Sequence, residues 1–216
     1  MKNALFTSLM VSVITLAGCS SRTAVETQNY EFVGPNDTLV AAEIGEFKVP
    51  ENRNDPNSRL LTLKFVKFPT TSEHPKNPIV YLAGGPGGSA TATAKRERFP
   101  LFMKLREVAD VILYDQRGTG LSNDLKTCQG QSVDLAEPSK LEKLTQIMES
   151  DLRHCVAQWH EQGVDLNGYN TKESAADLVA LSKALGTDKI NLWGISYGTH
   201  LAFATAKYHP EIIDSM

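Results

Sequence analysis

The pentapeptide at residues 194–198, Gly-Ile-Ser-Tyr-Gly, constrains the fold of this chain more than any other segment. An apolar run ending at Trp193 precedes it and a helix-forming run from Thr199 follows it, so we expect a strand, a sharp turn and a helix. A residue on so tight a turn has strained backbone geometry, and flanking glycines avoid collisions with the neighbouring strand and helix. The pattern therefore predicts that Ser196 stands exposed above a sheet, where a nucleophilic serine is found.

A second glycine cluster, Gly-Gly-Pro-Gly-Gly at residues 84–88, follows the buried-strand pattern of residues 78–83. Attack by a serine on a carbonyl needs an oxyanion hole, in which one donor is the amide after the nucleophile, here Tyr197. The other comes from a loop after an earlier strand, and Pro86 is excluded because it has no amide hydrogen. The candidates for this second donor are Gly84, Gly85 and Gly87. A phosphate-binding loop is the alternative, but the segment lacks the Gly-Lys-Ser/Thr ending and the Gly-x-Gly-x-x-Gly register.

A third strand pattern, at residues 111–115, ends in the turn sequence Gln-Arg-Gly-Thr-Gly-Leu-Ser. The motifs GGPGG, DQRGTGLS and WGISYGTHLA, in this order, resemble the α/β-hydrolase superfamily, and within it the prolyl and tripeptidyl aminopeptidase group. The resemblance covers residues 40–216. Ala83 stands where the family usually has a histidine, which favours the secreted tripeptidyl branch. The resemblance implies an α/β-hydrolase fold, with a mainly parallel sheet covered by helices on both faces.

The resemblance also implies roles for particular residues. Ser196 is the expected nucleophile, and the amides of Gly85 and Tyr197 are the expected oxyanion donors. The implied reaction releases residues or short peptides from peptide N-termini through an acyl-enzyme, without a cofactor or metal. Asp115 and Arg117 belong to a turn motif that we interpret as structural rather than catalytic. An esterase or lipase of the same fold is the nearest alternative, because peptide specificity rests on the resemblance alone.

The histidines of the chain are poorly placed to serve as the catalytic base. In this superfamily the acid and the histidine follow the nucleophile along the chain. His200 lies one helical turn after Ser196 on a helix that points away from the site, and His209 precedes Pro210 at the end of that helix. We interpret both as surface residues. His74, His154 and His160 are also poor candidates, because they lie in a loop and on a polar-rich helix before the turn. We therefore expect the triad acid and histidine outside this chain, which would be the N-terminal part of a hydrolase without its C-terminal strands and cap. The alternative is a catalytically inactive, truncated lipoprotein.

The N-terminus has the pattern of an export signal. Lys2 supplies a positive charge, residues 4–16 are apolar, and Leu-Ala-Gly-Cys follows, which resembles a bacterial lipobox ending at Cys19. The apolar stretch is shorter than the ~20 residues that span a bilayer. We expect a lipoprotein signal peptide at 1–18, a flexible tether at 19–36 and the hydrolase domain at 37–216. Because Ser20 is not Asp, we expect a lipid anchor on the periplasmic face of the outer membrane. An ordinary signal peptide with an incidental cysteine is the alternative.

Two further cysteines, Cys128 and Cys155, would lie in an oxidising compartment and can pair. A bridge between them would stabilise the fold by about 3–4 kcal/mol in the chain-entropy model. Members of the tripeptidyl-like branch have cysteines in similar places. Two buried free thiols are the alternative.

The composition is that of an ordinary globular protein, with 41% hydrophobic residues, 22% charged residues and a net charge of −3. The weakly acidic balance has no basic stripe for nucleic acid. Periodicity predicts a hairpin of strands at 39–49 and 60–68, further strands ending at Ala83 and Asp115, and a helix at 95–108. Two more helices are predicted, at 141–159, ended by Gly163, and at 171–185, capped by Asn170 with Glu173 as a capping-box partner. Oligomeric state is not indicated.

Overall fold

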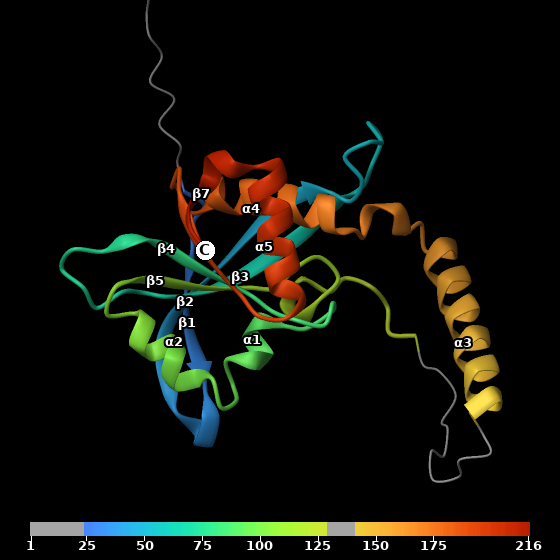
Figure 1. The fold of residues 1–216 in the computed structure, drawn as a ribbon, viewed down its shortest axis with the longest axis horizontal. Coiled ribbons are helices and arrows are strands. Elements are labelled where there is room, and N and C mark those ends of the chain that lie inside the picture. Colours follow the sequence, from blue (N-terminus) through green and yellow to red (C-terminus); the bar gives the residue numbers. More distant parts are fainter. Residues whose placement is uncertain (1–23, 129–140) are drawn as a thin grey trace, which may run out of the picture.

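The computed structural model describes residues 24–128 and 141–216, and its centre is one seven-stranded sheet (Figure 1). The strands run in the order β1-β2-β3-β5-β4-β6-β7. Their bounds are Gln28–Val33 (β1), Leu39–Pro50 (β2), Leu60–Phe68 (β3), Lys76–Leu82 (β4), Ala109–Tyr114 (β5), Ile190–Gly194 (β6) and Ile213–Ser215 (β7). The neighbours among β1, β2, β3 and β5 are antiparallel, and those among β5, β4, β6 and β7 are parallel. The parallel half of the sheet therefore brings the carboxyl ends of β4, β5 and β6 to one edge.

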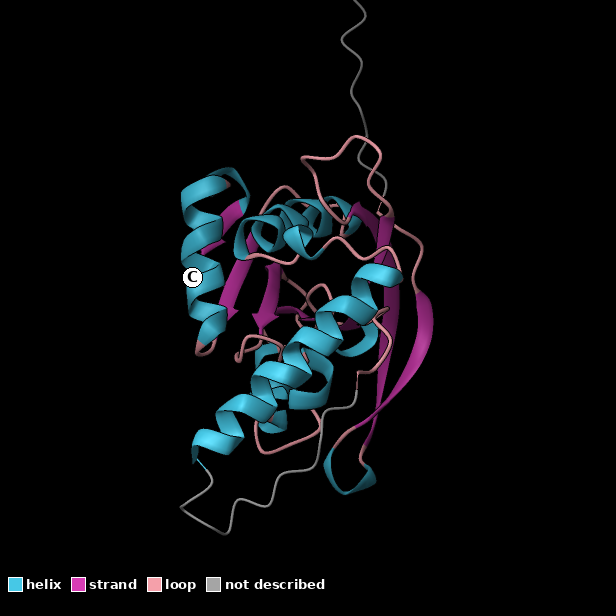
Figure 2. Cartoon of the chain, turned by 90° about the vertical axis from the view of Figure 1, so that its right-hand side faces the viewer, coloured by secondary structure: helices cyan, strands magenta, loops and turns pink. Residues whose placement is uncertain are grey.

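Helices lie on both faces of the sheet (Figures 1 and 2). The α-helices are Ala90–Thr93 (α1), Phe99–Leu105 (α2), Leu141–Glu161 (α3), Thr171–Ala184 (α4) and Tyr197–Tyr208 (α5). Short 3-10 turns span Pro35–Asp37, Gly120–Ser122, Leu166–Gly168 and Pro210–Ile212. Helices α4 and α5 pack on one face around Leu82 and Ile112, and α1 and α2 pack on the other around Tyr81 and Leu113. Successive residues of each strand thus point into opposite cores, as the two-residue period of a strand requires.

The strand β1 corrects the expected tether at residues 19–36. Gln28–Val33 pairs with β2 in antiparallel register, and Phe32 is buried beside Phe68 with ring centroids 5.0 Å apart. A segment with only one fully buried apolar side chain has a weak sequence signal, but the exposed edge of β2 supplies the backbone partners that it needs. The expected signal peptide at 1–18 and the lipidated Cys19 lie outside the described residues. Among the described residues, no helix has both the length and the apolar character that crossing a membrane requires.

The predicted helix at 95–108 is wrong in extent. The chain forms α1 immediately after the loop at 84–88, then turns, and only resumes as α2 at Phe99. Pro100 lies in the first turn of α2, the one part of a helix where proline costs no hydrogen bond. The helix therefore begins at Phe99, with this proline in its first turn, and does not run through from Lys95.

The other predicted elements are confirmed, with one change at the start of α4. The Asn170 side chain accepts a hydrogen bond from the Glu173 N–H at 3.0 Å, as a cap should. The Glu173 carboxylate does not complete the capping box, because it forms an ion pair of 2.6 Å with Arg53. The residue that the sequence assigned to a local cap thus makes a contact between distant segments.

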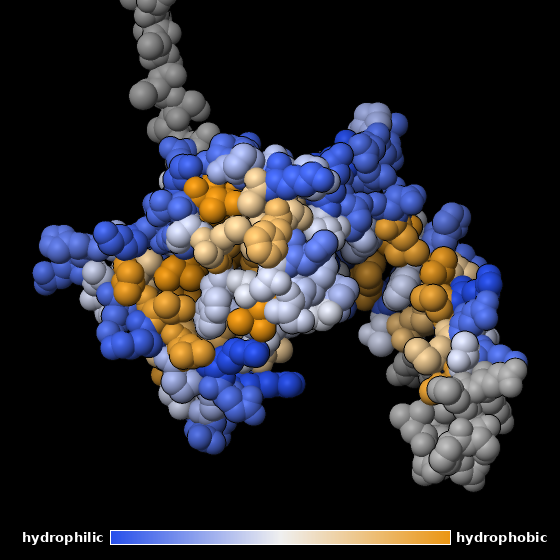
Figure 3. All heavy atoms as spheres, viewed as in Figure 1, coloured by the Kyte–Doolittle hydropathy of each residue, from blue (hydrophilic) through white to orange (hydrophobic). Residues whose placement is uncertain are grey.

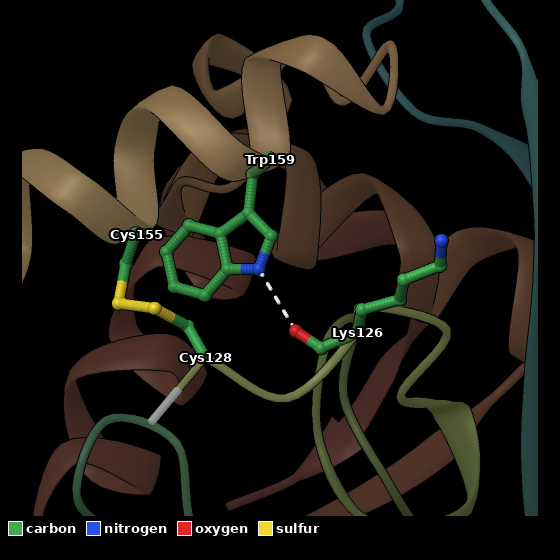
Figure 4. The surroundings of a disulfide bond; sticks show 4 residues. All are labelled: Lys126, Cys128, Cys155 and Trp159. Atoms are coloured by element: carbon green, nitrogen blue, oxygen red, sulfur yellow. Dashed lines mark hydrogen bonds between the residues drawn. A yellow bond between two sulfur atoms is a disulfide. The ribbon is translucent and has the colours of Figure 1, made fainter. Parts of the chain in front are cut away.

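Helix α3 lies apart from the sheet and its covering helices (Figure 1). The predicted bridge is present: Cys128 and Cys155 form a disulfide with their Cα atoms 5.6 Å apart. Beside it, the indole N–H of Trp159 donates to the carbonyl of Lys126 at 3.1 Å (Figure 4). Apolar side chains remain exposed along the helix, among them Met148 and Leu152, each 62% exposed (Figure 3). Helix α3 is therefore attached at its C-terminal half to the segment that follows the turn at 116–122.

Candidate active site

The turn between β6 and α5 has the strained geometry that the sequence predicted. Ser196 has φ 54° and ψ −122°, one of the few non-glycine residues with positive φ among those described. Such a conformation costs about 1–3 kcal/mol and persists only where the surrounding structure enforces it. The Ser196 side chain is exposed at the start of α5. The fold thus holds the backbone of Ser196 in a conformation that the local sequence alone would not adopt.

Close packing of backbone on backbone explains the two glycines of this turn. A Cβ on Gly198 would collide with the carbonyl oxygen of Leu82 in β4. A Cβ on Gly194 would lie 2.5 Å from the Gly198 carbonyl oxygen. The turn is further tied to β4 by a 3.2 Å hydrogen bond from the Ile195 N–H to the Leu82 carbonyl. Gly198 is therefore required because α5 begins directly against β4, and Gly194 because the end of β6 lies against the first turn of α5.

The loop at 84–88 lies against Ser196. A Cβ on Gly84 would lie 2.9 Å from the Ser196 Cβ and 3.3 Å from its Oγ, so this backbone passes directly beside the nucleophile candidate. The loop closes through a 3.0 Å hydrogen bond from the Gly88 N–H to the Gly84 carbonyl. Among the turn and cap hydrogen bonds of the described residues, the amides of all three loop candidates, Gly84, Gly85 and Gly87, and that of Tyr197 donate to no carbonyl. These amides remain available to a ligand, which is what an oxyanion hole needs.

Within the described residues, no histidine forms a hydrogen bond with Ser196, and the Ser196 Oγ makes no hydrogen bond with any of them. His200 is exposed on α5, with its ring centroid 5.8 Å from that of Tyr197. His209 has its Nδ1 3.4 Å from a carboxylate oxygen of Glu211. His74, His154 and His160 lie in a loop and on α3. The described residues also contain no cluster of side chains that could hold a metal ion.

Asp115, at the end of β5, has the structural role that the sequence favoured. Its buried carboxylate accepts hydrogen bonds from the Ser89 hydroxyl at 3.0 Å and from the Thr91 hydroxyl at 2.6 Å. It also accepts from the backbone N–H groups of Thr91 at 3.2 Å and Leu121 at 2.9 Å. The carboxylate therefore joins the start of α1 to the turn at 120–122, and α1 in turn supports the loop at 84–88.

Arg117 is also bound in a structural network. Its guanidinium makes a two-point contact with the Asp177 carboxylate of α4, at 2.7 and 2.8 Å, and donates to the carbonyls of Glu51 at 2.6 Å and Gly168 at 2.5 Å. Arg53 shares the same Asp177 carboxylate at 2.8 Å. Burial alone would lower the pKa of Arg117, but the hydrogen bonds and charge of Asp177 outweigh it and raise that pKa above its ordinary value. This arginine is charged and its donors are occupied.

Glu51 anchors a neighbouring group of polar residues. Its carboxylate accepts from the Arg59 guanidinium at 2.5 Å, from the Tyr169 hydroxyl at 3.0 Å and from the Asp165 N–H at 3.0 Å. Burial raises the pKa of Glu51, but these hydrogen bonds outweigh it, so the net pKa is below the ordinary value of 4.5. The β2–β3 connection is thereby held against the segment before α4.

Sequence reasoning missed these network residues, namely Glu51, Arg53, Arg59 and Asp177. One signal was present: Asp177 lies on the apolar stripe of α4 with Leu178 and Leu181, and an acid on a buried face needs a cationic partner. Glu51 and Arg53 carried no such signal, because they lie in a turn-rich connection that reads as solvent-exposed.

The comparison with protein-family models agrees with this architecture. The family model described as alpha/beta hydrolase fold matches residues 77–216. The chain is 28% identical over 183 residues to serine protease Hip1 of Mycobacterium tuberculosis, covering 80% of this chain and 34% of that protein. It is 24% identical over 183 residues to tripeptidyl aminopeptidase of Streptomyces lividans, covering 81% and 34%. The structure of proline iminopeptidase from Mycobacterium smegmatis aligns with a TM-score of 0.44 at 16% identity, covering 78% and 41%. The chain spans about a third of the length of these curated relatives. Because the family model matches well over half of its residues, the chain belongs to the alpha/beta hydrolase fold family.

Proposed function

We propose that this chain carries the nucleophile of a serine peptidase of the aminopeptidase type. The observation that carries the proposal is the backbone of Ser196, strained at φ 54° between β6 and α5 and packed against the loop at 84–88. In the proposed reaction, the Ser196 Oγ attacks the carbonyl carbon of a peptide and forms an acyl-enzyme with release of the amine. Amides of Tyr197 and Gly85 stabilise the tetrahedral oxyanion, and water then releases the acyl group.

The base and the acid of the triad are proposed to come from residues that this sequence does not contain. This proposal is supported by the absence of a histidine hydrogen-bonded to Ser196 among the described residues, and by the length of the relatives, of which the chain covers about a third. It is tested by reading the DNA downstream of the Met216 codon. An open frame that encodes an acid followed by a histidine supports the proposal, and an immediate stop codon opposes it.

The peptide substrate and the location of the protein are proposed on different grounds. The names of the relatives, a serine protease and a tripeptidyl aminopeptidase, support peptides as substrates. The sequence Leu-Ala-Gly-Cys supports lipidation of Cys19 and an anchor on the periplasmic face of the outer membrane. Metabolic labelling with a palmitate analogue tests the anchor, since Cys19→Ala should abolish incorporation.

The nucleophile is tested with a fluorophosphonate on the full-length protein. We expect covalent labelling of the wild type, none in Ser196→Ala, and unchanged labelling in His200→Ala, whose exposed imidazole lies on the same helix. Aminoacyl-peptide anilides and short-chain esters then separate the two reactions. Hydrolysis of the anilides supports the peptidase, whereas hydrolysis of the esters alone would replace it with an esterase.

A further inference from the structure

A cavity of about 200 Å³ lies beside the proposed oxyanion donors. Its lining includes Tyr197 itself and Pro86 and Gly87, which directly follow Gly85. The turn at 116–119 and the segment that leads into α4 complete the wall. At about 30 Å³ for each water molecule, the cavity has room for several waters or for one amino-acid side chain. It therefore lies where part of a substrate bound at Ser196 could enter.

The lining presents no unpaired charge. Of the described residues that line it, only Arg117 is formally charged, and its guanidinium is occupied by Asp177 and by backbone carbonyls. The Tyr169 hydroxyl in the wall donates to Glu51, and burial raises its pKa well above the ordinary value of 10, so it stays neutral. Among the described residues, no carboxylate lines the cavity. An ammonium or carboxylate group would therefore lose its hydration here without finding an opposite charge.

The lining does present polar atoms without partners. Ser174, on α4, is only 5% exposed, and its hydroxyl makes no hydrogen bond with another described residue. Gln116 is also 5% exposed; its Nε2 donates to the Ala83 carbonyl at 3.3 Å, and its Oε1 accepts from no described residue. The Tyr114 hydroxyl is the one side-chain polar atom of the described residues that is both sealed from solvent and without a partner, so the Ser174 and Gln116 oxygens keep accessible surface, as expected of atoms that face a cavity. The cavity thus offers a hydroxyl and a carbonyl oxygen to an incoming neutral group.

We propose that this cavity is a substrate subsite for an uncharged, hydrogen-bonding side chain, such as a carboxamide, and that it disfavours acidic and basic side chains. The inference rests on the proposed function of Ser196, since it assigns a part of the same substrate. It also places the ammonium group of an aminopeptidase substrate elsewhere, because the part of the lining that the structure describes has no carboxylate to bind it.

The test uses the full-length protein and two peptidyl phosphonate diphenyl esters that label a reactive serine. They differ only in the side chain beside the phosphorus, which is glutamine-like in one and glutamate-like in the other. We expect the glutamine-like reagent to label Ser196 about tenfold faster. Ser174→Val, which removes the hydroxyl and adds bulk, should erase this preference.

Ser182→Val is the matched control. Ser182 is a buried serine of the same helix, 2% exposed, and its hydroxyl donates to the Val179 carbonyl away from the cavity. This variant should keep the preference, and a small ethyl fluorophosphonate should label all three proteins at equal rates. Equal labelling by both peptidyl reagents in the wild type overturns the subsite, and so does an unchanged preference in Ser174→Val.

A second measurement separates failure of the subsite from failure of the proposed function. If ethyl fluorophosphonate does not label the wild type, Ser196 is not a reactive nucleophile. Binding is then followed by NMR in Ser196→Ala with N-acetylglutamine methylamide and N-acetylglutamate methylamide. Shifts of the Ser174 and Gln116 amide signals with the glutamine compound alone support the subsite. Shifts with both compounds, or with neither, overturn it.

Discussion

Two turns at the carboxyl ends of parallel strands have opposite characters. The turn after β5 has its charged side chains buried and fully paired, with the Asp115 carboxylate accepting four hydrogen bonds and Arg117 held by Asp177. The turn after β6 has a strained residue, Ser196, whose hydroxyl is exposed and has no partner among the described residues. Both turns open beside the loop at 84–88.

The contrast shows how a rigid turn can support a reactive one. The Asp115 carboxylate holds the start of α1, and α1 follows directly on the loop that lies against Ser196. A paired polar network contributes order, whereas an unpaired hydroxyl in a strained conformation is available for chemistry. We therefore expect substitutions in the turn after β5 to change the stability of the protein. Substitutions in the turn after β6 should change both its stability and the reactivity of Ser196.

The largest expected effect follows from removing the positive charge of Arg117 in the turn after β5. Arg117→Met leaves the buried Asp177 carboxylate with only Arg53, so we expect a loss of about 3–5 kcal/mol in the free energy of unfolding. Urea denaturation measures it. Arg53→Met is the matched control, because Arg53 shares the same carboxylate but is 28% exposed, and its loss should cost clearly less. Equal losses for the two variants would mean that burial of Arg117 does not set the cost.

The second prediction concerns the packing that holds the reactive turn. Gly198→Ala places a methyl group against the Leu82 carbonyl, which should cost about 1–3 kcal/mol of stability and slow fluorophosphonate labelling of Ser196. Stability is read from urea denaturation, and labelling from gel fluorescence. His200→Ala, at an exposed position of the same helix, should change stability by no more than about 0.5 kcal/mol. Wild-type labelling in Gly198→Ala would contradict the role assigned to close packing.

The third prediction is a gain in stability. Glycine adopts positive φ without the penalty that other residues incur, so Ser196→Gly should raise the free energy of unfolding by about 1 kcal/mol while abolishing labelling. Ser196→Ala should also abolish labelling but gain less, because alanine keeps the strain. If the two variants are equally stable, Ser196 carries no backbone strain that glycine can relieve.

The smallest expected effect is a pH dependence of the protein's stability, which arises from Glu51 in the polar network beside the turn after β5. Because the pKa of folded Glu51 lies below 4.5, its stabilising contribution is complete above pH 4.5. The contribution is lost as the pH falls from 4.5 through the folded-state pKa. Glu51→Gln should therefore lose less stability than the wild type over this range, as measured by thermal melts at several pH values. If the stability of the two proteins changes with pH in the same way, Glu51 does not contribute to the loss of stability at low pH.

The sequence predicted the local features of the site because each had a local physical cause. Glycines at 194 and 198 indicated a crowded turn, and the apolar runs before Ala83 and Asp115 indicated buried strands that end at the same edge. The extent of α2 and the strand β1 were missed. Helix α2 is shorter than predicted because Pro100 is accommodated only in the first turn of a helix, and β1 forms because it pairs with the edge of β2.

By itself, the sequence determined the order of most strands, turns and helices and the position of Ser196 on a sharp turn, and it offered Cys128 and Cys155 as a possible pair. Those features depend on periodicity, on glycine and proline geometry, and on residue types within a short window. Only the tertiary structure decided that Glu173 pairs with Arg53 rather than with its own helix, and that Ser174 and Gln116 face one cavity. The reason is that these contacts join segments far apart in the chain, and their energies depend on burial, which no local pattern specifies.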